Sequence, residues 1–383
     1  MKIVLVAGAR PNFMKVAPLL EAFRAKRYLL PELQLLLVHT GQHYDAQMSS
    51  EFFRDLEMPM PDVYLGAGSG SHAEQTARIM IAFEKVCVEH KPVLVVVVGD
   101  VNSTLACAIS AKKLGIAVAH VEAGLRSRDM TMPEEINRLC TDVISDFLFT
   151  TDQLADNNLI AEGHPREQIH FVGNTMIDSL TKNLDRALTA PLPGGLAAGT
   201  YALLTLHRPS NVDDPSALLR LVDAINAIAQ NIPIVFPAHP RTAHRVSGSH
   251  LHERVQLMEP LGYLAFLGLM ARARLVLTDS GGIQEETTVL HVPCLTLRQN
   301  TERPITCEQG TNRVVGTEPE DILRSALQVL NAPPPKNRAP ERWDGFAGER
   351  IADILLAWLS RKASGYGNAR LQTATKTVLG SNS

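Results

Sequence analysis

Residues 120–138, which read HVEAGLRSRDMTMPEEINR, bring three glutamates together after an apolar run: Glu122, Glu134 and Glu135. A fourth carboxylate, Asp100, directly follows the apolar run VVVVG. When two carboxylates are paired in a partly desolvated site, their pKa values move apart. One of them then works as a general acid and its neighbour as a general base. If two adjacent parallel strands end at Asp100 and Glu122, both side chains face the same cleft. These residue types and positions point to proton transfer.

Three of these carboxylates also have a structural interpretation. Asp100 is of a type preferred at a helix N-cap. The spacing of Thr131 and Glu134 fits a capping box, in which the two side chains satisfy backbone N–H groups at a helix start. Glu135 and Arg138, three residues apart, fit a helix ion pair. The residues alone therefore leave a choice between proton transfer and helix capping, with structure slightly favoured at the capping box.

Two glycine-containing stretches have the form of an anion site at the start of a helix. GARPNFMK (residues 8–15) follows the first apolar run, and its Arg10 and Lys15 add positive charge beside the backbone N–H groups. DSGGIQEE (residues 279–286) is more specific, because two glycines at a helix start sacrifice helix stability for close backbone approach. One turn further on, Glu286 is placed to accept hydrogen bonds from sugar hydroxyls. The first stretch also fits an ordinary turn, whereas the second predicts a phosphate-binding site.

A histidine, His207, ends the apolar run YALLTLH at the same side of its predicted sheet. A histidine in this position is as often structural as catalytic, and both interpretations stay open. The thirteen histidines show no metal-ligand spacing. The chain has no Gly-x-Ser-x-Gly nucleophile elbow, and no strand leads into the glycines of GAGSGSHAEQ. The sequence therefore predicts neither a metal nor a cofactor.

The elements that must position these residues alternate between short apolar runs and longer helical periods. Runs such as KIVLVAG, LQLLLVHTG and PVLVVVVGD are typical of strands buried on both faces of a parallel sheet. The series breaks at the Pro- and Gly-rich residues 190–200 and again at residues 331–341. We therefore expect an α/β protein with two doubly wound, Rossmann-like domains, residues 1–175 and 176–346. A terminal helix over residues 347–364 would bridge them, followed by a polar tail over residues 365–383.

Composition narrows the class of protein. The chain has 383 residues and a formal net charge of −3, without the basic block that nucleic-acid binding requires. No apolar run is long enough to span a bilayer, and MKIVLVAGARPN is better explained as a first strand than as a signal peptide. Five scattered cysteines fit a reducing compartment rather than a disulfide framework. We expect a cytoplasmic protein that binds neither nucleic acid nor membrane.

Several motifs, spread in order from residue 3 to about residue 316, resemble those of one family. They are GARPNFMKVAPL, HTGQHYD, GDVNSTLA, HVEAGLRS, MPEEINR, VGNTMID, LTDSGGIQEE, TERP and GTNRVVG. Together they look like the motifs of the non-hydrolysing UDP-N-acetylglucosamine 2-epimerases. The resemblance implies a GT-B-like fold, in which the active site lies in the cleft between two Rossmann-like domains. It also implies a homodimer.

The family reverses the configuration at carbon 2 of the sugar, converting UDP-N-acetylglucosamine reversibly into UDP-N-acetylmannosamine for polysaccharide biosynthesis. UDP is eliminated to give a 2-acetamidoglucal and is added back after protonation on the other face, without a redox cofactor. The resemblance implies catalytic roles for Asp100, Glu122 and Glu134, with His207 assisting UDP departure or return. It implies that the UDP-sugar is bound by Arg10, Lys15, Ser280, Gly281, Gly282, Glu286 and Arg303, with Arg303 near the diphosphate.

The chain departs from the family pattern in the stretch that follows the second predicted strand. Regulated members carry QHRQ there, in a second UDP-N-acetylglucosamine site, whereas this chain has Gln42-His43-Tyr44-Asp45. The GQHYD form also occurs in relatives that epimerise a UDP-linked 2,3-diacetamido uronic acid. That sugar is therefore an alternative substrate. A GT-B glycosyltransferase and a non-catalytic UDP-sugar-binding module are the alternatives to epimerisation.

Overall fold

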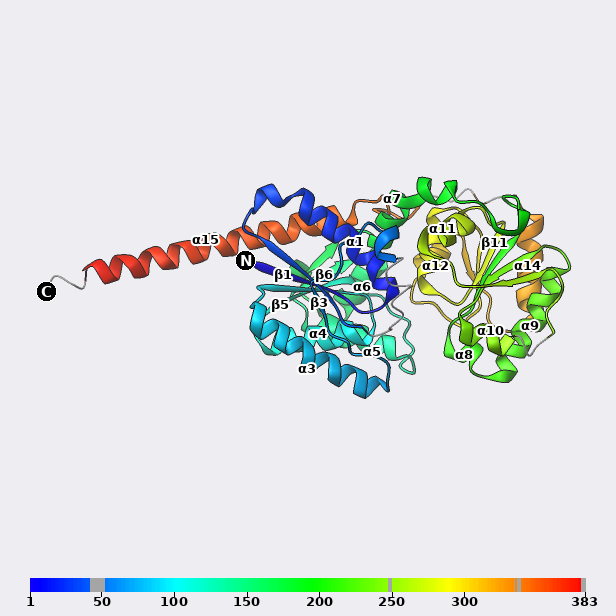
Figure 1. Ribbon diagram of the computed structural model, residues 1–383, viewed down its shortest axis with the longest axis horizontal. Helices are drawn as coiled ribbons and strands as arrows, with labels where there is room; N and C mark the ends of the chain where they lie inside the picture. Colours follow the sequence, from blue (N-terminus) through cyan, green and yellow to red (C-terminus); the bar gives the residue numbers. More distant parts are fainter. Residues whose placement is uncertain (42–51, 247–249, 334, 336–338, 380–383) are drawn as a thin grey trace.

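The computed structural model describes residues 1–41, 52–246, 250–333, 335 and 339–379. The departing stretch at residues 42–45 lies outside these residues, as do the side chains of Arg10, Pro209, Arg241 and residues 365–379. The chain is built around two parallel β-sheets, one of seven strands and one of six. Figure 1 shows the two sheets side by side, each with helices on both faces.

The first sheet has the strand order β3-β2-β1-β4-β5-β6-β7, with parallel pairing throughout. Its strands are β1 (Lys2–Ala7), β2 (Gln34–His39), β3 (Val63–Tyr64), β4 (Leu94–Val98), β5 (Ala117–Ala123), β6 (Phe147–Thr150) and β7 (Ile169–Phe171). The helices around it are α1 (Arg10–Ala25), α3 (His72–His90), α4 (Asn102–Lys113), α5 (Pro133–Ile144), α6 (Gln153–Ala161) and α7 (Thr175–Thr189), with 3₁₀ turns η1 (Arg27–Leu29) and η2 (Arg166–Gln168).

The apolar runs of this half are buried on both faces of the sheet, as predicted. Ile3 and Leu5 of β1 pack into one core with α1, whereas Val4 and Val6 pack into another with α3 and α4. This alternation follows from the two-residue period of a strand. Because the strands are parallel, their carboxyl ends lie along one edge of the sheet, and Asp100 follows one of these ends.

The second sheet repeats the arrangement with the order β10-β9-β8-β11-β12-β13, and its pairs are also parallel. Its strands are β8 (Ala202–Thr205), β9 (Ile234–Pro237), β10 (Val255–Met258), β11 (Leu275–Thr278), β12 (Cys294–Thr296) and β13 (Asn312–Val314). Its helices are α8 (Pro209–Val212), α9 (Pro215–Ala229), α10 (Pro240–Val246), α11 (Tyr263–Ala271), α12 (Gly281–Val289), α13 (Ile305–Glu308) and α14 (Pro319–Asn331), with a 3₁₀ turn η3 (Pro193–Gly195) before β8.

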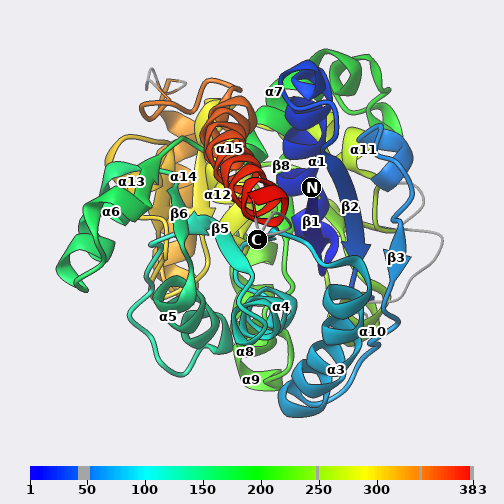
Figure 2. The same cartoon turned by 90° about the vertical axis from the view of Figure 1, so that its left-hand side faces the viewer.

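The last helix, α15 (Ala347–Leu379), returns to the first sheet and packs against α1 and α7. Figures 1 and 2 show it lying along α1 and pointing away from the second sheet. The Asp178 carboxylate of α7 accepts hydrogen bonds from the backbone N–H groups of Ala347 (3.1 Å) and Gly348 (2.7 Å) at the start of α15. Burial raises the pKa of Asp178 to about 6, although these bonds oppose the shift. α15 is therefore tied to α7.

The end of α15 corrects one expectation. The sequence predicted a terminal helix over residues 347–364 and a polar tail over residues 365–383. The helix instead continues to Leu379. Polar composition does not prevent a helix, and many of the residues after 364 are types that helices accommodate well, such as Ala, Arg, Leu, Gln and Lys. The predicted domain boundaries at residues 175 and 346 stay predictions.

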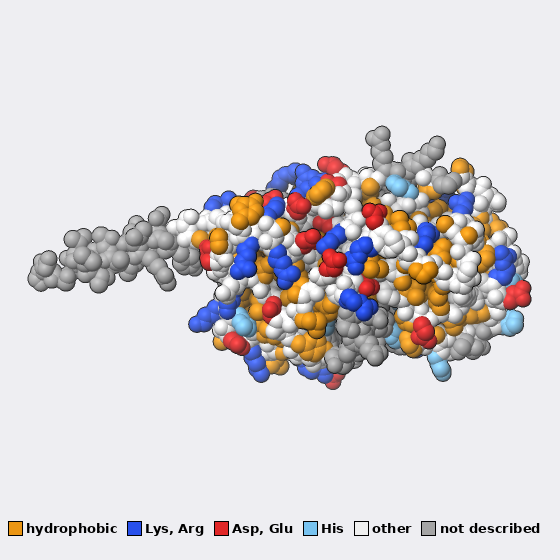
Figure 3. Space-filling view, turned by 45° about the horizontal axis from the view of Figure 1, so that its top comes forward, with side chains coloured by type: hydrophobic (Ala, Val, Ile, Leu, Met, Phe, Trp, Pro, Cys, Tyr) orange, Lys and Arg blue, Asp and Glu red, His pale blue; other side chains and the backbone are white. Residues whose placement is uncertain are grey.

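On the face shown in Figure 3, Lys and Arg side chains are interspersed with Asp and Glu side chains. Among the described residues, no helix has the length and apolar character needed to cross a membrane. The same residues contain no group of three or more His, Cys, Asp and Glu side chains arranged to hold a metal ion.

Candidate functional site

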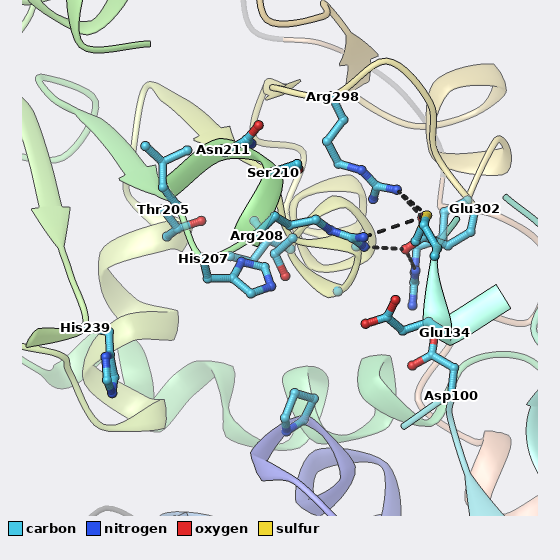
Figure 4. Close-up of a pocket in the computed structure, with 18 of the residues that line it drawn as sticks. Asp100, Glu134, Thr205, His207, Arg208, Ser210, Asn211, His239, Arg298 and Glu302 are labelled. Atoms are coloured by element: carbon cyan, nitrogen blue, oxygen red, sulfur yellow. Dashed lines mark hydrogen bonds and ion pairs between the residues drawn. The ribbon is translucent and has the colours of Figure 1, made fainter. Parts of the chain in front are cut away.

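A cleft of about 1050 Å³ lies between the two sheets and is lined by residues from both halves of the chain. Asp100 and Glu134 come from the first half, and His207, Ser280 and Glu286 come from the second. Figure 4 shows Asp100 and Glu134 close together on one side of this cavity, with His207 across from them. The structure thus collects most of the residues singled out in the sequence around one space.

Asp100 follows β4 through Gly99, whose positive φ of 66° turns the chain at the end of the strand. Its Oδ2 accepts from Arg138, at 3.0 Å from Nε and 2.7 Å from Nη2. Burial raises the pKa of Asp100, but the charges of Arg138, Lys15 and Arg303 outweigh burial and hold that pKa below its ordinary value. The predicted alternative, a helix cap, is wrong, because α4 begins after Val101 without a side-chain cap. Asp100 is thus an ionised carboxylate in the cleft.

Glu134 lies in the first turn of α5 and also lines the cleft. The predicted capping box is wrong. The Thr131 hydroxyl donates to Asp129 Oδ1 instead (2.6 Å), and the helix N-cap is Met132. Within the described residues, the Glu134 carboxylate has no hydrogen bond or ion pair. A carboxylate without structural partners at the edge of a cleft is available for chemistry.

Glu135, the neighbour of Glu134, is structural. It is buried, and it accepts hydrogen bonds from the backbone N–H groups of Ser127 (2.9 Å) and Arg128 (2.8 Å). Its predicted ion pair with Arg138 is confirmed, and both partners are buried. Because the Arg138 guanidinium also binds Asp100, it joins the loop before α5 to the end of β4.

Glu122 occupies an unusual backbone position at the end of β5. Its φ is 76°, in a region that L-residues other than Asn and Asp rarely adopt, and the pairing of β5 with β6 shifts register at this point. Its carboxylate forms ion pairs with Lys15 and with Arg303 (3.0 Å). Glu122 is buried and is not among the residues that line the cleft. Both side chains were predicted to face one cleft. Asp100 lines it, whereas Glu122 does not.

His207 follows β8 and is paired with Asp279, the residue after β11. Its Nδ1 lies 2.7 Å from Asp279 Oδ1, and the side chain is 60% exposed toward the cleft. The Asp279 carboxylate also accepts from the backbone N–H groups of His207 (3.1 Å) and Arg208 (3.0 Å). Burial raises the pKa of Asp279, but these hydrogen bonds and the charge of His207 outweigh burial and hold the pKa low. Asp279 therefore orients the ring so that Nε2 is left for a ligand.

The glycines at the start of α12 are needed for close packing. A Cβ on Gly281 would lie 2.3 Å from Arg303 Nη1, and a Cβ on Gly282 would lie 2.8 Å from the Cε of Met176. Ser280, Gly281 and Gly282 all line the cleft, so the first N–H groups of α12 face a position suited to an anion. The phosphate-binding role of this stretch stays a prediction.

Glu286 lies one turn further into α12 and also lines the cleft. Burial, together with the neighbouring Glu285, raises the pKa of Glu286 to about 8. Burial likewise raises the pKa of Glu285 to about 7, with Arg303 opposing the shift. A carboxyl that holds its proton near neutral pH both donates and accepts hydrogen bonds, which suits a sugar hydroxyl.

Arg303 is surrounded by three carboxylates. Its guanidinium nitrogens lie 2.6 Å from Glu302, 3.0 Å from Glu122 and 3.0 Å from Glu285. Glu302 also binds Arg298 at 2.8 Å and Arg208 at 3.6 Å, and Figure 4 draws these contacts beside Glu134. Arg303 and the ion pair of Arg138 with Glu135 were predicted, whereas Glu302, Arg298, Arg208 and Asp279 were not predicted as site residues. Arg208 and Asp279 follow strands, a position that could have indicated them, but no spacing in the sequence places Glu302 beside Arg208.

Comparisons with known proteins match most of the chain to UDP-sugar 2-epimerases. The model of a family described as UDP-N-acetylglucosamine 2-epimerase matches residues 29–356. A UDP-N-acetylglucosamine 2-epimerase of Methanococcus maripaludis is 41% identical over 376 residues, covering 93% of this chain and 98% of the relative. A UDP-2,3-diacetamido-2,3-dideoxy-D-glucuronate 2-epimerase of Pseudomonas aeruginosa is 44% identical over 361 residues, covering 93% of this chain and 99% of the relative.

A solved structure extends the agreement to the fold. The crystal structure of Methanocaldococcus jannaschii UDP-GlcNAc 2-epimerase in complex with UDP-GlcNAc and UDP matches with a TM-score of 0.85 and 42% identity. The match covers 93% of this chain and 99% of that one. The fold is therefore GT-B-like, with two Rossmann-like halves, which confirms the expected fold class.

Proposed function

Because this chain belongs to the UDP-N-acetylglucosamine 2-epimerase family, we propose that it is an isomerase that inverts carbon 2 of a UDP-linked 2-acetamido sugar. The observation that supports this proposal most strongly is that Asp100 and Glu134 face one cleft, opposite His207 and the start of α12. Two carboxylates that line the same part of the cleft suit the removal of a proton from one face of a carbon and its return on the other, and a helix start with a histidine suits a departing diphosphate.

The proposed reaction balances without a redox step. One carboxylate accepts the carbon 2 proton, and the electrons of that bond form the carbon 1–carbon 2 double bond of a 2-acetamidoglucal while the bond from carbon 1 to UDP breaks. A proton then returns to carbon 2 on the other face, and UDP adds back to carbon 1. His207 Nε2 donates to the departing diphosphate oxygen, with the ring held by Asp279 at 2.7 Å.

The nucleotide is proposed to lie against the second half of the chain. The N–H groups at the start of α12 would hold the diphosphate, with Ser280, Gly281 and Gly282 closest, and Glu286 would bind the ribose. Lys15 and Arg303, which line the same cleft, would supply positive charge. Arg10 begins α1, and its contact with phosphate stays a prediction from the sequence.

We propose UDP-N-acetylglucosamine as the substrate, interconverted with UDP-N-acetylmannosamine. The sequence relative from M. maripaludis and the structural relative from M. jannaschii both carry the corresponding name. The second candidate is the UDP-linked 2,3-diacetamido uronic acid, because the relative from P. aeruginosa is 44% identical. Comparing the products formed from both UDP-sugars distinguishes the candidates.

Reaction in heavy water tests the chemistry. We expect each molecule of epimerised product to carry one deuterium at carbon 2 and none at carbon 3 or carbon 4, because only the carbon 2 proton passes through exchangeable carboxyl groups. Mass spectrometry and proton NMR of the product measure this. Epimerised product without deuterium would contradict the elimination mechanism. Transfer of the sugar to an added acceptor would indicate a glycosyltransferase, and UDP-sugar binding without turnover would indicate a sensor.

We also propose that the protein works in the cytoplasm as a homodimer that pairs through the outer face of α3 and α5. Both helices pack on either side of α4, and they expose Ile81, Val88, Ile136 and Val143. Exposed apolar side chains gathered on neighbouring helices are typical of an interface. We expect Val143→Asp to shift the protein toward monomers in analytical ultracentrifugation, whereas Leu219→Asp, at another exposed apolar residue, on α9, leaves the mass unchanged. A wild-type monomer would contradict the proposal.

A further inference from the structure

We propose that Glu122 is a positioning residue that acts through Lys15 and Arg303, and that Asp100 and Glu134 are the carboxylates that meet the sugar. This inference rests on the proposed function. It assigns different tasks to three carboxylates that the sequence places together. Two of them line the cleft, whereas the third lies beneath it and holds two cations that line it.

The burial of the three side chains supports this division. The Glu122 side chain is 3% exposed, compared with 20% for Asp100, and Glu122 does not line the cleft. Lys15 and Arg303 do line it, and each binds a different oxygen of Glu122: Lys15 binds Oε2 and Arg303 binds Oε1. With one cation on each oxygen and almost no exposed surface, the carboxylate is shielded from a sugar in the cleft.

The backbone around Glu122 is fixed in a way that suits this position. The positive φ of Glu122 costs about 1–3 kcal/mol and persists only where the surroundings enforce it. Two residues later, the N–H of Gly124 donates to Asp142 Oδ2 (3.1 Å). Asp142 is buried and also binds His120 (2.6 Å) and Arg126 (2.7 Å). The strained turn that places Glu122 beneath the cleft is therefore stabilised by the buried hydrogen bonds and ion pairs of Asp142.

The two cations that Glu122 holds come from different halves of the chain. Lys15 belongs to α1, next to the first sheet. Its Nζ packs close to Gly99, because a Cβ added to Gly99 would lie only 3.0 Å from it. Arg303 belongs to the second half and packs against Gly281 at the start of α12. Glu122 therefore sets one cation beside the chain segment that carries Asp100 and another beside the proposed diphosphate site. Removing a partner of a buried charge lowers the stability of the protein, because the remaining charge is left uncompensated.

A double-mutant cycle on kcat/KM tests the proposal. If Glu122 acts through Lys15 and Arg303, Glu122→Gln should cost about 10²-fold in the wild-type background and about tenfold less than that in a Lys15→Met background, because one of its two contacts is already lost there. Glu134→Gln serves as the matched control, since Glu134 has no hydrogen bond or ion pair with Lys15 within the described residues. Its cost should be the same in both backgrounds. Deuterium incorporation at carbon 2 should persist in Lys15→Met/Glu122→Gln.

Other results would overturn the proposal. If Glu122→Gln costs as much in the Lys15→Met background as in the wild type, Glu122 does not act through Lys15 and the proposal is wrong. If Glu122→Gln alone fails to fold, the double variant, which removes both members of the ion pair, is compared with Lys15→Met alone. A further loss of about tenfold or less supports the proposal, and a further loss of about 10²-fold contradicts it. A wild-type enzyme without activity on any UDP-sugar would instead count against the proposed function.

Discussion

Glu134→Gln is expected to lower kcat by about 10³-fold, because an amide cannot exchange a proton as a carboxyl group does. The Kd for UDP and the free energy of unfolding should stay close to those of the wild type. Glu134 lines the cleft and has no hydrogen bond or ion pair within the described residues, so the substitution removes no structural contact. Steady-state kinetics, calorimetric titration with UDP and urea denaturation measure the three quantities.

The neighbouring carboxylate provides the control for this experiment. Glu135 is buried, accepts from the N–H groups of Ser127 and Arg128, and pairs with Arg138. Glu135→Gln should therefore lower the free energy of unfolding, which Glu134→Gln leaves unchanged. Retained activity together with reduced stability in Glu134→Gln would mean that Glu134 supports the start of α5 and takes no part in catalysis.

Arg138→Met is expected to lower the free energy of unfolding by about 3–5 kcal/mol, because it leaves buried carboxylates without their counter-ion. Arg138 binds Asp100 through two nitrogens and Glu135 through a third, and all these groups are largely buried. The loss of a fixed Asp100 should also reduce kcat/KM. Urea denaturation followed by circular dichroism measures the stability change.

An exposed pair of the same spacing is the matched control for Arg138. Arg324 pairs with Asp321 three residues earlier, and both side chains are exposed on α14. Arg324→Met should change the free energy of unfolding by less than about 1 kcal/mol. Equal effects of the two substitutions would show that the contacts of Arg138 do not stabilise the fold.

The apolar runs predicted the longer strands well, because parallel strands covered on both faces leave a continuous apolar signature. β3, which pairs through only two residues, leaves no such pattern in the sequence. The capping box was wrong because the Asp129 carboxylate takes the Thr131 hydroxyl, a local competition that spacing does not reveal. Asp100, Glu134, His207 and the start of α12 were found as strand or helix ends. The partners that orient them, Arg138 for Asp100 and Asp279 for His207, follow from the packing of distant segments.

The return of α15 has a consequence for how the chain folds during synthesis. Ile351, Leu355 and Leu359 of α15 are buried in the same core as Ile3 and Leu5 of the first strand. That core is therefore incomplete until residues 351–359 have left the ribosome. Contacts so far apart in sequence form late and slow folding. Until then, the first half keeps apolar surface exposed, and a nascent chain in this condition is a target for chaperones and a risk for aggregation.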